Sequence, residues 1–194
     1  MDLSSTYTAF EGDRRITAGR LPDVALAVKK IVERPDHGAV LIFDDSTGRS
    51  VDFDLRGTDD DVIERFGRGW EEQQSRSPGR PKLGVVAREV TLLPRHWGWL
   101  SSQPGGASAA LRRLVETARA ARGDRDRARQ AMEVSDRFMT AMAGNLPGYE
   151  EAARALYGSD GARFNEMTSA WPPDVRDHAR SLAAPAFTGG SDGE

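Results

Sequence analysis

Residues 87–119, AREVTLLPRHWGWLSSQPGGASAALRRLVETAR, decide how this chain is organised. Val85–Leu93 has the composition of a strand, and Pro94 follows it as the natural first residue of a helix. The sequence Pro104-Gly105-Gly106 then predicts a tight turn, after which a second helix starts near Ser108. The stretch therefore predicts one strand, a helix, a turn and another helix, in that order.

This order resembles the ribbon-helix-helix module of Arc-type bacterial repressors. In that family two chains pair their single strands into a ribbon that enters the major groove, and the second helix binds a phosphate at its N-terminus. The resemblance implies a homodimer that binds DNA. Carried over position by position, it assigns base contacts to Arg88 and Thr91, and a phosphate clamp to Gly106, Ala107 and Ser108.

Basic residues precede the module, and Arg76, Arg80 and Lys82 suit an arm that contacts the DNA backbone. The strand departs from the family's pattern. Counting back from Pro94, the usual outward positions fall on Leu92, Val90 and Arg88, so that two of three base-reading positions are apolar. Alternation alone leaves the register of this strand open.

Charge is distributed unevenly along the chain. The formal net charge of the whole sequence is -3. Residues 1–70 sum to about -4, residues 71–130 to about +6 and residues 131–194 to about -5, a division typical of proteins with a polyanion-binding segment. The opposed charges also suit a second hypothesis, an adaptor whose basic segment docks an acidic protein partner.

The N-terminal region predicts an α+β domain of hairpins packed on helices. Short strands are expected at 6–10 and 15–18, a helix after Pro22, and a hairpin formed by strands 39–43 and 51–55. Thr58 is expected to cap a short helix that begins with three Asp residues. Separate helices are expected at 94–103, 108–130, 132–144, 149–158, 162–171 and 173–184.

The fold class is therefore α+β, with one strand and a mostly helical C-terminal part after the N-terminal domain. The predicted divisions are an α+β domain (1–66), a basic Gly/Pro/Arg linker (67–84), a ribbon-helix-helix-like segment (85–130), a helical domain (131–184) and a disordered tail (185–194).

Motifs for catalysis, cofactors and metals are missing. The chain has no Cys, its three His residues are far apart in sequence, and no phosphate-loop, dinucleotide-binding or nucleophile-elbow motif occurs. We expect no cofactor and no metal. An enzyme hypothesis has only the carboxylates Asp44, Asp45, Glu150 and Glu151 as candidate acids and bases.

The sequence also indicates a protein that stays in the cell interior. A chain without Cys suits the reducing cytoplasm, no signal peptide is recognisable, and no apolar run approaches the roughly 18 residues that span a bilayer. We therefore expect a cytoplasmic protein with no membrane partner.

Nearly the whole chain is similar to a bacterial family that is a domain of unknown function. The stretches that carry the similarity are VLIFDDSTGRSVDFDLRG, GRPKLGVVAREVTLLPRHWGWLSSQPGGASAALRRLV, RFMTAMAGNLPGYEEAARALY and WPPDVRDHA. The resemblance implies a cytoplasmic bacterial protein of the same layout, and it supplies no activity, substrate or catalytic residue.

Overall fold

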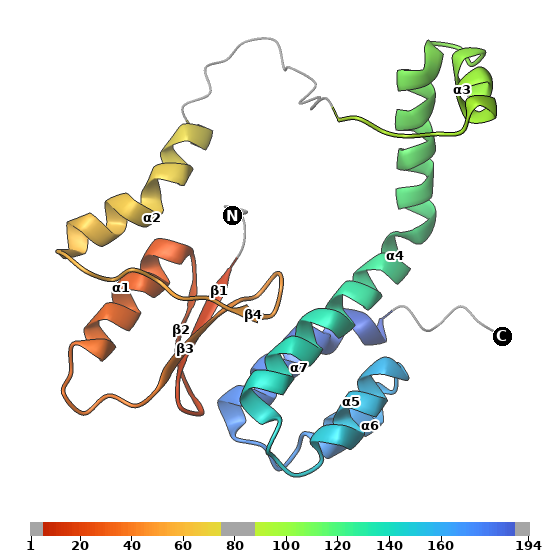
Figure 1. Ribbon diagram of the computed structural model, residues 1–194. Coiled ribbons are helices and arrows are strands. Elements are labelled where there is room, and N and C mark those ends of the chain that lie inside the picture. The colour runs from red at the N-terminus through yellow and green to blue at the C-terminus, as the bar shows by residue number, and fades with distance from the viewer. Residues whose placement is uncertain (1–5, 75–87, 189–194) are drawn as a thin grey trace. The chain divides into compact units, whose positions relative to one another are not determined.

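The computed structural model describes residues 6–74 and 88–188, and it confirms the α+β class (Figure 1). The elements in chain order are β1 (Tyr7–Glu11), β2 (Arg14–Gly19), α1 (Leu21–Val32), β3 (Val40–Asp44), β4 (Arg49–Ser50), α2 (Asp59–Gln74), α3 (Pro94–Ser101), α4 (Gly106–Ala143), α5 (Tyr149–Tyr157), α6 (Gly161–Met167) and α7 (Pro173–Phe187).

The chain forms two compact units. Within the described residues, the larger unit comprises 6–74 and 127–188, and the smaller unit comprises 88–126. The regions 1–66 and 131–184, which the sequence suggests as separate domains, thus belong to the same unit. The physical reason is that the sheet has two apolar faces, and the N-terminal region supplies a cover for only one of them.

The sheet is antiparallel throughout, with the strand order β2-β1-β3-β4. Alternation along β1 places Tyr7 and Ala9 against α1, in a cluster that also contains Val24 and Val28. The opposite face carries Phe10 and Phe43, which pack against Phe138 of α4. The ring centroids of Phe43 and Phe138 are 4.9 Å apart.

The turn between β3 and β4, residues 45–48, is anchored on α4. Arg137 donates a hydrogen bond from Nη1 to the carbonyl oxygen of Thr47 at 2.9 Å. Gly48 has φ +68°, and a Cβ added there would lie 2.1 Å from the carbonyl oxygen of Val134. Only glycine fits this turn, because both the left-handed backbone and the close approach exclude a side chain.

The hairpin is confirmed, but its second strand is shorter than predicted. β4 contains only two residues, and the segment 51–55 is not a strand. Its apolar side chains still pack inward, as Phe53 contacts Tyr7 and Phe66. Arg65 of α2 donates hydrogen bonds to the main-chain carbonyl oxygens of Asp54 and Arg56, so these acceptors are satisfied outside the sheet.

Several helix boundaries also differ from the predictions, and α6 ends at Met167 instead of residue 171. The expected helices 108–130 and 132–144 form the single helix α4, since no Pro or turn-forming sequence separates them. α7 continues past the expected start of the tail at residue 185, because Phe187 packs on Phe164. α2 extends to Gln74, so that residues 67–74 of the expected linker are helical.

Candidate functional site

The smaller unit contains the features from which the sequence suggests a function. Leu93 precedes α3 in an extended conformation, and Pro94 occupies the first turn of that helix. Gly105 and Gly106 have φ of +83° and +75°, which turns the chain from α3 into α4. The predicted succession of a helix, a tight turn and a second helix is therefore present.

The predicted strand is not formed in the single chain. Residues 88–93 are neither helix nor strand, and residues 85–87 lie outside the described part. The four strands of the described sheet all belong to the larger unit, so residues 88–93 have no strand beside them, and an unpaired strand leaves its backbone groups without partners.

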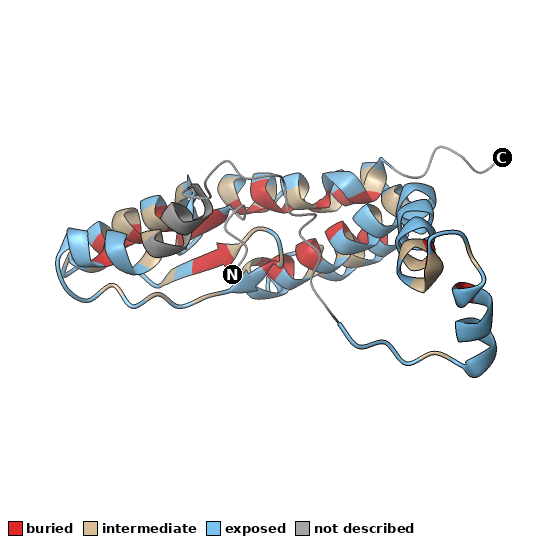
Figure 2. Ribbon diagram, turned by 90° about the horizontal axis from the view of Figure 1, so that it is seen from above, coloured by how far each residue is buried: buried red, intermediate tan, exposed pale blue. Residues whose placement is uncertain are grey.

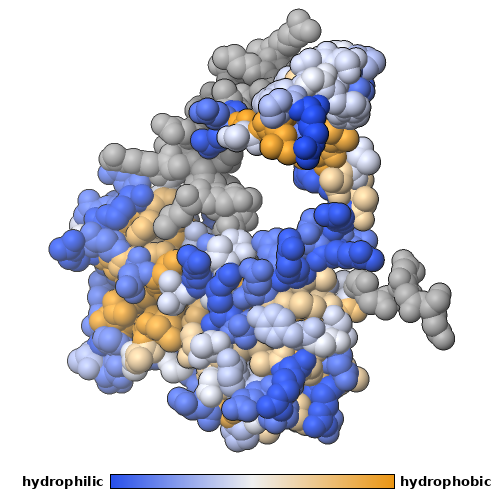
Figure 3. Space-filling model, turned by 45° about the vertical axis from the view of Figure 1, so that its right-hand side comes forward, coloured by the Kyte–Doolittle hydropathy of each residue, from blue (hydrophilic) through white to orange (hydrophobic). Residues whose placement is uncertain are grey.

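Leu92, α3 and the start of α4 enclose an open apolar cavity of about 280 Å³. It is lined by Leu92, His96, Trp99, Leu100, Leu111 and Leu114. Figure 3 shows a hydrophobic, orange patch on the part of the molecule that contains α3. Three segments of the smaller unit thus contribute apolar side chains to one concave face.

The smaller unit leaves most of its large apolar side chains exposed, including Trp99 and Leu114 of this concave face. Within residues 88–126, Leu100 and Ala110 are the buried apolar residues, and most of the other residues of this range are exposed (Figure 2). Large apolar side chains that are 39–53% exposed are Val90, Leu93, Trp97, Trp99, Leu114 and Val115. Sequence patterns alone do not identify this exposed apolar surface, because they do not show which apolar residues find partners in the fold.

The predicted DNA contacts have different surroundings. Arg88, Thr91 and Ser108 are exposed, while Gly106 and Ala107 are partly exposed. The Gly106 N–H donates to the carbonyl oxygen of Gln103 at 2.9 Å, so this amide of the expected phosphate clamp is already engaged. The arm residues Arg76, Arg80 and Lys82 lie outside the described residues.

The position of Leu92 indicates which side of residues 88–93 faces the helices, a question that the sequence left open. Leu92 lines the apolar cavity and therefore faces α3 and α4. If residues 88–93 pair as a strand, alternation places Thr91 on the opposite side and Arg88 on the same side as Leu92.

The carboxylates of the enzyme hypothesis have local partners. Asp44 accepts hydrogen bonds from the backbone N–H and hydroxyl of Ser46, at 2.8 and 2.6 Å. Glu150 and Glu151 form ion pairs with Arg154 at the surface of α5. These interactions explain the three carboxylates as parts of a turn and of a helix N-terminus.

Asp45 is the exception among these carboxylates, because it is held inside the larger unit. Its Oδ1 lies 3.3 Å from Nε2 of His178 on α7, and its Oδ2 accepts a hydrogen bond from Thr8 at 3.0 Å. The His178 ring packs edge-on against Phe10 and Phe138. Sequence reasoning missed this pair, since its members are 133 positions apart and share no motif.

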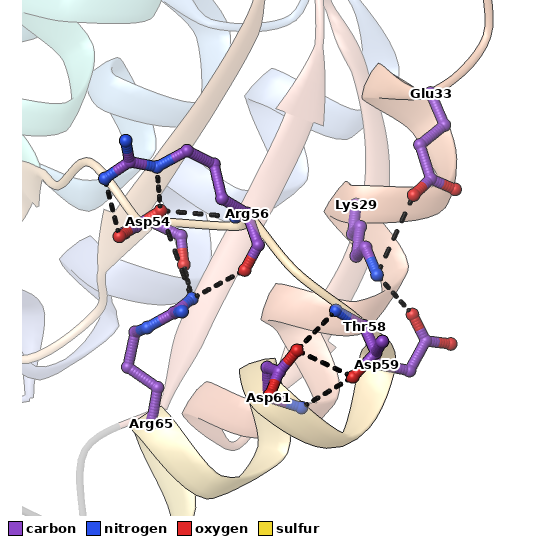
Figure 4. A network of polar contacts seen from close by, with 8 residues as sticks. All are labelled: Lys29, Glu33, Asp54, Arg56, Thr58, Asp59, Asp61 and Arg65. Carbon is purple, nitrogen blue, oxygen red and sulfur yellow. Dashed lines mark hydrogen bonds and ion pairs between the residues drawn. The ribbon is translucent and has the colours of Figure 1, made fainter.

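A polar network fixes the N-terminus of α2 (Figure 4). Thr58 and Asp61 form a reciprocal cap, in which the Thr58 Oγ1 accepts from the Asp61 N–H and the Asp61 carboxylate accepts from the Thr58 N–H. Lys29 of α1 donates to Asp59 at 2.7 Å, and this hydrogen bond lowers the pKa of Asp59. The predicted cap at Thr58 and acidic first turn are confirmed.

The described part of the chain contains neither a metal-binding cluster nor a membrane-spanning helix. Across residues 6–74 and 88–188, no three His, Asp or Glu side chains are grouped so that they could hold a metal ion. Among the helices described over the same ranges, none has the length and apolar character needed to cross a membrane.

Comparison with known proteins places the chain in a family. No match was found among curated proteins or among solved structures. Residues 6–183 match a family described as "Uncharacterized protein conserved in bacteria (DUF2239)". Because this match covers most of the 194 residues, the chain belongs to the DUF2239 family of uncharacterized bacterial proteins.

Proposed function

We propose that this protein is a homodimeric DNA-binding regulator, and that its smaller unit provides both the dimer contact and the DNA contact. The observation that carries the proposal is the uncovered apolar face of residues 88–126. A unit with fewer than about 70 residues rarely buries enough apolar surface to be stable alone. Association supplies the missing cover.

A second copy of the chain is the partner that best fits this face. The exposed large apolar residues in the described part of the larger unit are Leu41, Ile63 and Tyr157, which belong to three different elements. They do not offer a matching set of side chains within one element. A second copy carries the same apolar face, and a twofold axis brings identical patches together.

Charge supports DNA as the ligand of the dimer. Residues 88–126 contain seven Arg residues and four acidic residues, which favours a polyanion over an acidic or neutral surface. In a paired ribbon, Thr91 faces away from the helices and towards the major groove. Arg88, on the other side of the strand, is then suited to a phosphate contact rather than to a base.

The dimer contact is tested by Leu114→Arg. Leu114 is 48% exposed and lines the apolar cavity, so an arginine there leaves a charge unpaired in the dimer interface. Sedimentation equilibrium is expected to show a wild-type dimer and a monomeric variant. Ile63→Arg is the matched control, because Ile63 is 43% exposed on α2 of the larger unit. A wild-type monomer at high concentration contradicts the proposal.

DNA binding is tested by fluorescence anisotropy with the gene's own upstream DNA and a scrambled duplex, from about 50 to 200 mM salt. We expect selective binding that weakens linearly in log salt. Thr91→Ala is expected to reduce the selectivity by roughly 1 to 3 kcal/mol, and Arg88→Ala to weaken binding to both duplexes. A dimer that binds neither duplex at low salt refutes the regulator and favours the adaptor hypothesis.

A further inference from the structure

One side of α4 changes from apolar to basic side chains along the helix. Leu111, Leu114, Val115 and Ala118 recur at spacings of three and four residues and therefore lie on one side. Leu111 and Leu114 line the apolar cavity, and Val115 is 53% exposed. These four residues define an apolar stripe that covers about two turns of the helix.

The same side continues with arginines. Ala121, Arg122 and Arg125 extend the three- and four-residue spacing, and both arginines are exposed. In the described part of the chain, neither arginine has a hydrogen-bond or ion-pair partner. Packing this part of α4 against the same part of a second copy brings arginines of both chains together, and juxtaposed like charges at an interface are unfavourable.

We infer that the homodimer contact along α4 consists of the apolar stripe and ends at Ala118. Arg122 and Arg125 remain in water in the dimer and prevent the two copies from pairing along the rest of the helix. This inference rests on the proposed homodimer and defines the extent of its interface. Arg125 lies seven residues beyond Ala118, about 10 Å further along the helix.

Single cysteines measure this boundary directly, because the chain contains no Cys of its own. The variants V115C and R125C are treated with a maleimide at protein concentrations below and above the dimer dissociation constant, which sedimentation equilibrium determines for each variant. The Val115 position is expected to react at least about tenfold more slowly in the dimer, because a packed interface excludes the reagent. The Arg125 position is expected to react at the same rate in both states.

A120C is the matched control, since Ala120 lies on the opposite side of α4 and is exposed. Protection of both V115C and R125C refutes the boundary and leaves the homodimer intact. A dimer in which V115C reacts as fast as A120C refutes the apolar stripe as the contact. A V115C chain that stays monomeric is compared with A120C, and a monomer in both cases refutes the homodimer and this inference together.

Discussion

Among the glycines of the larger unit, Gly48 is the one at which an added methyl group is expected to reduce the unfolding free energy most. Gly48→Ala places a Cβ 2.1 Å from the carbonyl oxygen of Val134 and keeps φ at +68°. The left-handed backbone costs about 1 to 2 kcal/mol for a residue with a side chain. Relieving the collision requires movement of the turn away from α4, which adds about 1 to 3 kcal/mol.

The expected loss is therefore roughly 2 to 5 kcal/mol of unfolding free energy, out of a total of about 5 to 15 for a typical domain. Urea denaturation followed by circular dichroism measures it. Gly12→Ala is the matched control, since Gly12 has φ +57° and open space around its Cβ position. If both variants lose the same stability, the close packing of the turn on α4 contributes nothing and the reasoning is refuted.

Two further predictions concern the N-terminus of α2. Thr58→Ala removes the side-chain acceptor for the Asp61 N–H and is expected to cost about 1 kcal/mol in urea denaturation. Thr117→Ala, at an exposed site, is the control. If the urea midpoint of Thr58→Ala equals that of the control and of the wild type, the cap is contradicted. The hydrogen bond from Lys29 lowers the pKa of Asp59 below its ordinary value of 3.8. The contribution of Asp59 to stability is therefore present above pH 3.8 and is lost as the pH falls through the lowered pKa. Between pH 7 and 2, Lys29→Met is expected to lose less unfolding free energy than the wild type. If the unfolding free energies of the two proteins change in parallel with pH, the ion pair is contradicted.

Local patterns predicted the elements whose determinants are close in sequence. The hairpin of β1 and β2, the first-turn prolines of α1 and α3, and the cap at Thr58 all depend on residues within a few positions of one another. The grouping of the sheet with the C-terminal helices depends instead on contacts such as Phe43 with Phe138. Periodicity shows that both residues are apolar, and it carries no information about their pairing.

The sequence predicted only part of the candidate site, because its other features depend on contacts between residues that are distant in sequence. Pro94 and the two glycines before Ala107 mark the two helices, so that the order of elements in the smaller unit follows from the sequence. The uncovered face depends on which apolar residues find partners in three dimensions. Val90 and Val115 are exposed, although composition alone makes each of them a candidate core residue.

The two-sided sheet has a consequence for the order in which the protein folds during synthesis. α1 follows β1 and β2 directly and can cover its face of the sheet as soon as β3 has emerged from the ribosome. The face with Phe10 and Phe43 waits for α4 and α7, more than 90 residues later, which takes on the order of ten seconds of translation. During that interval the nascent chain presents an aromatic sheet face to solvent, and the region 1–75 released alone is expected to aggregate or to recruit chaperones.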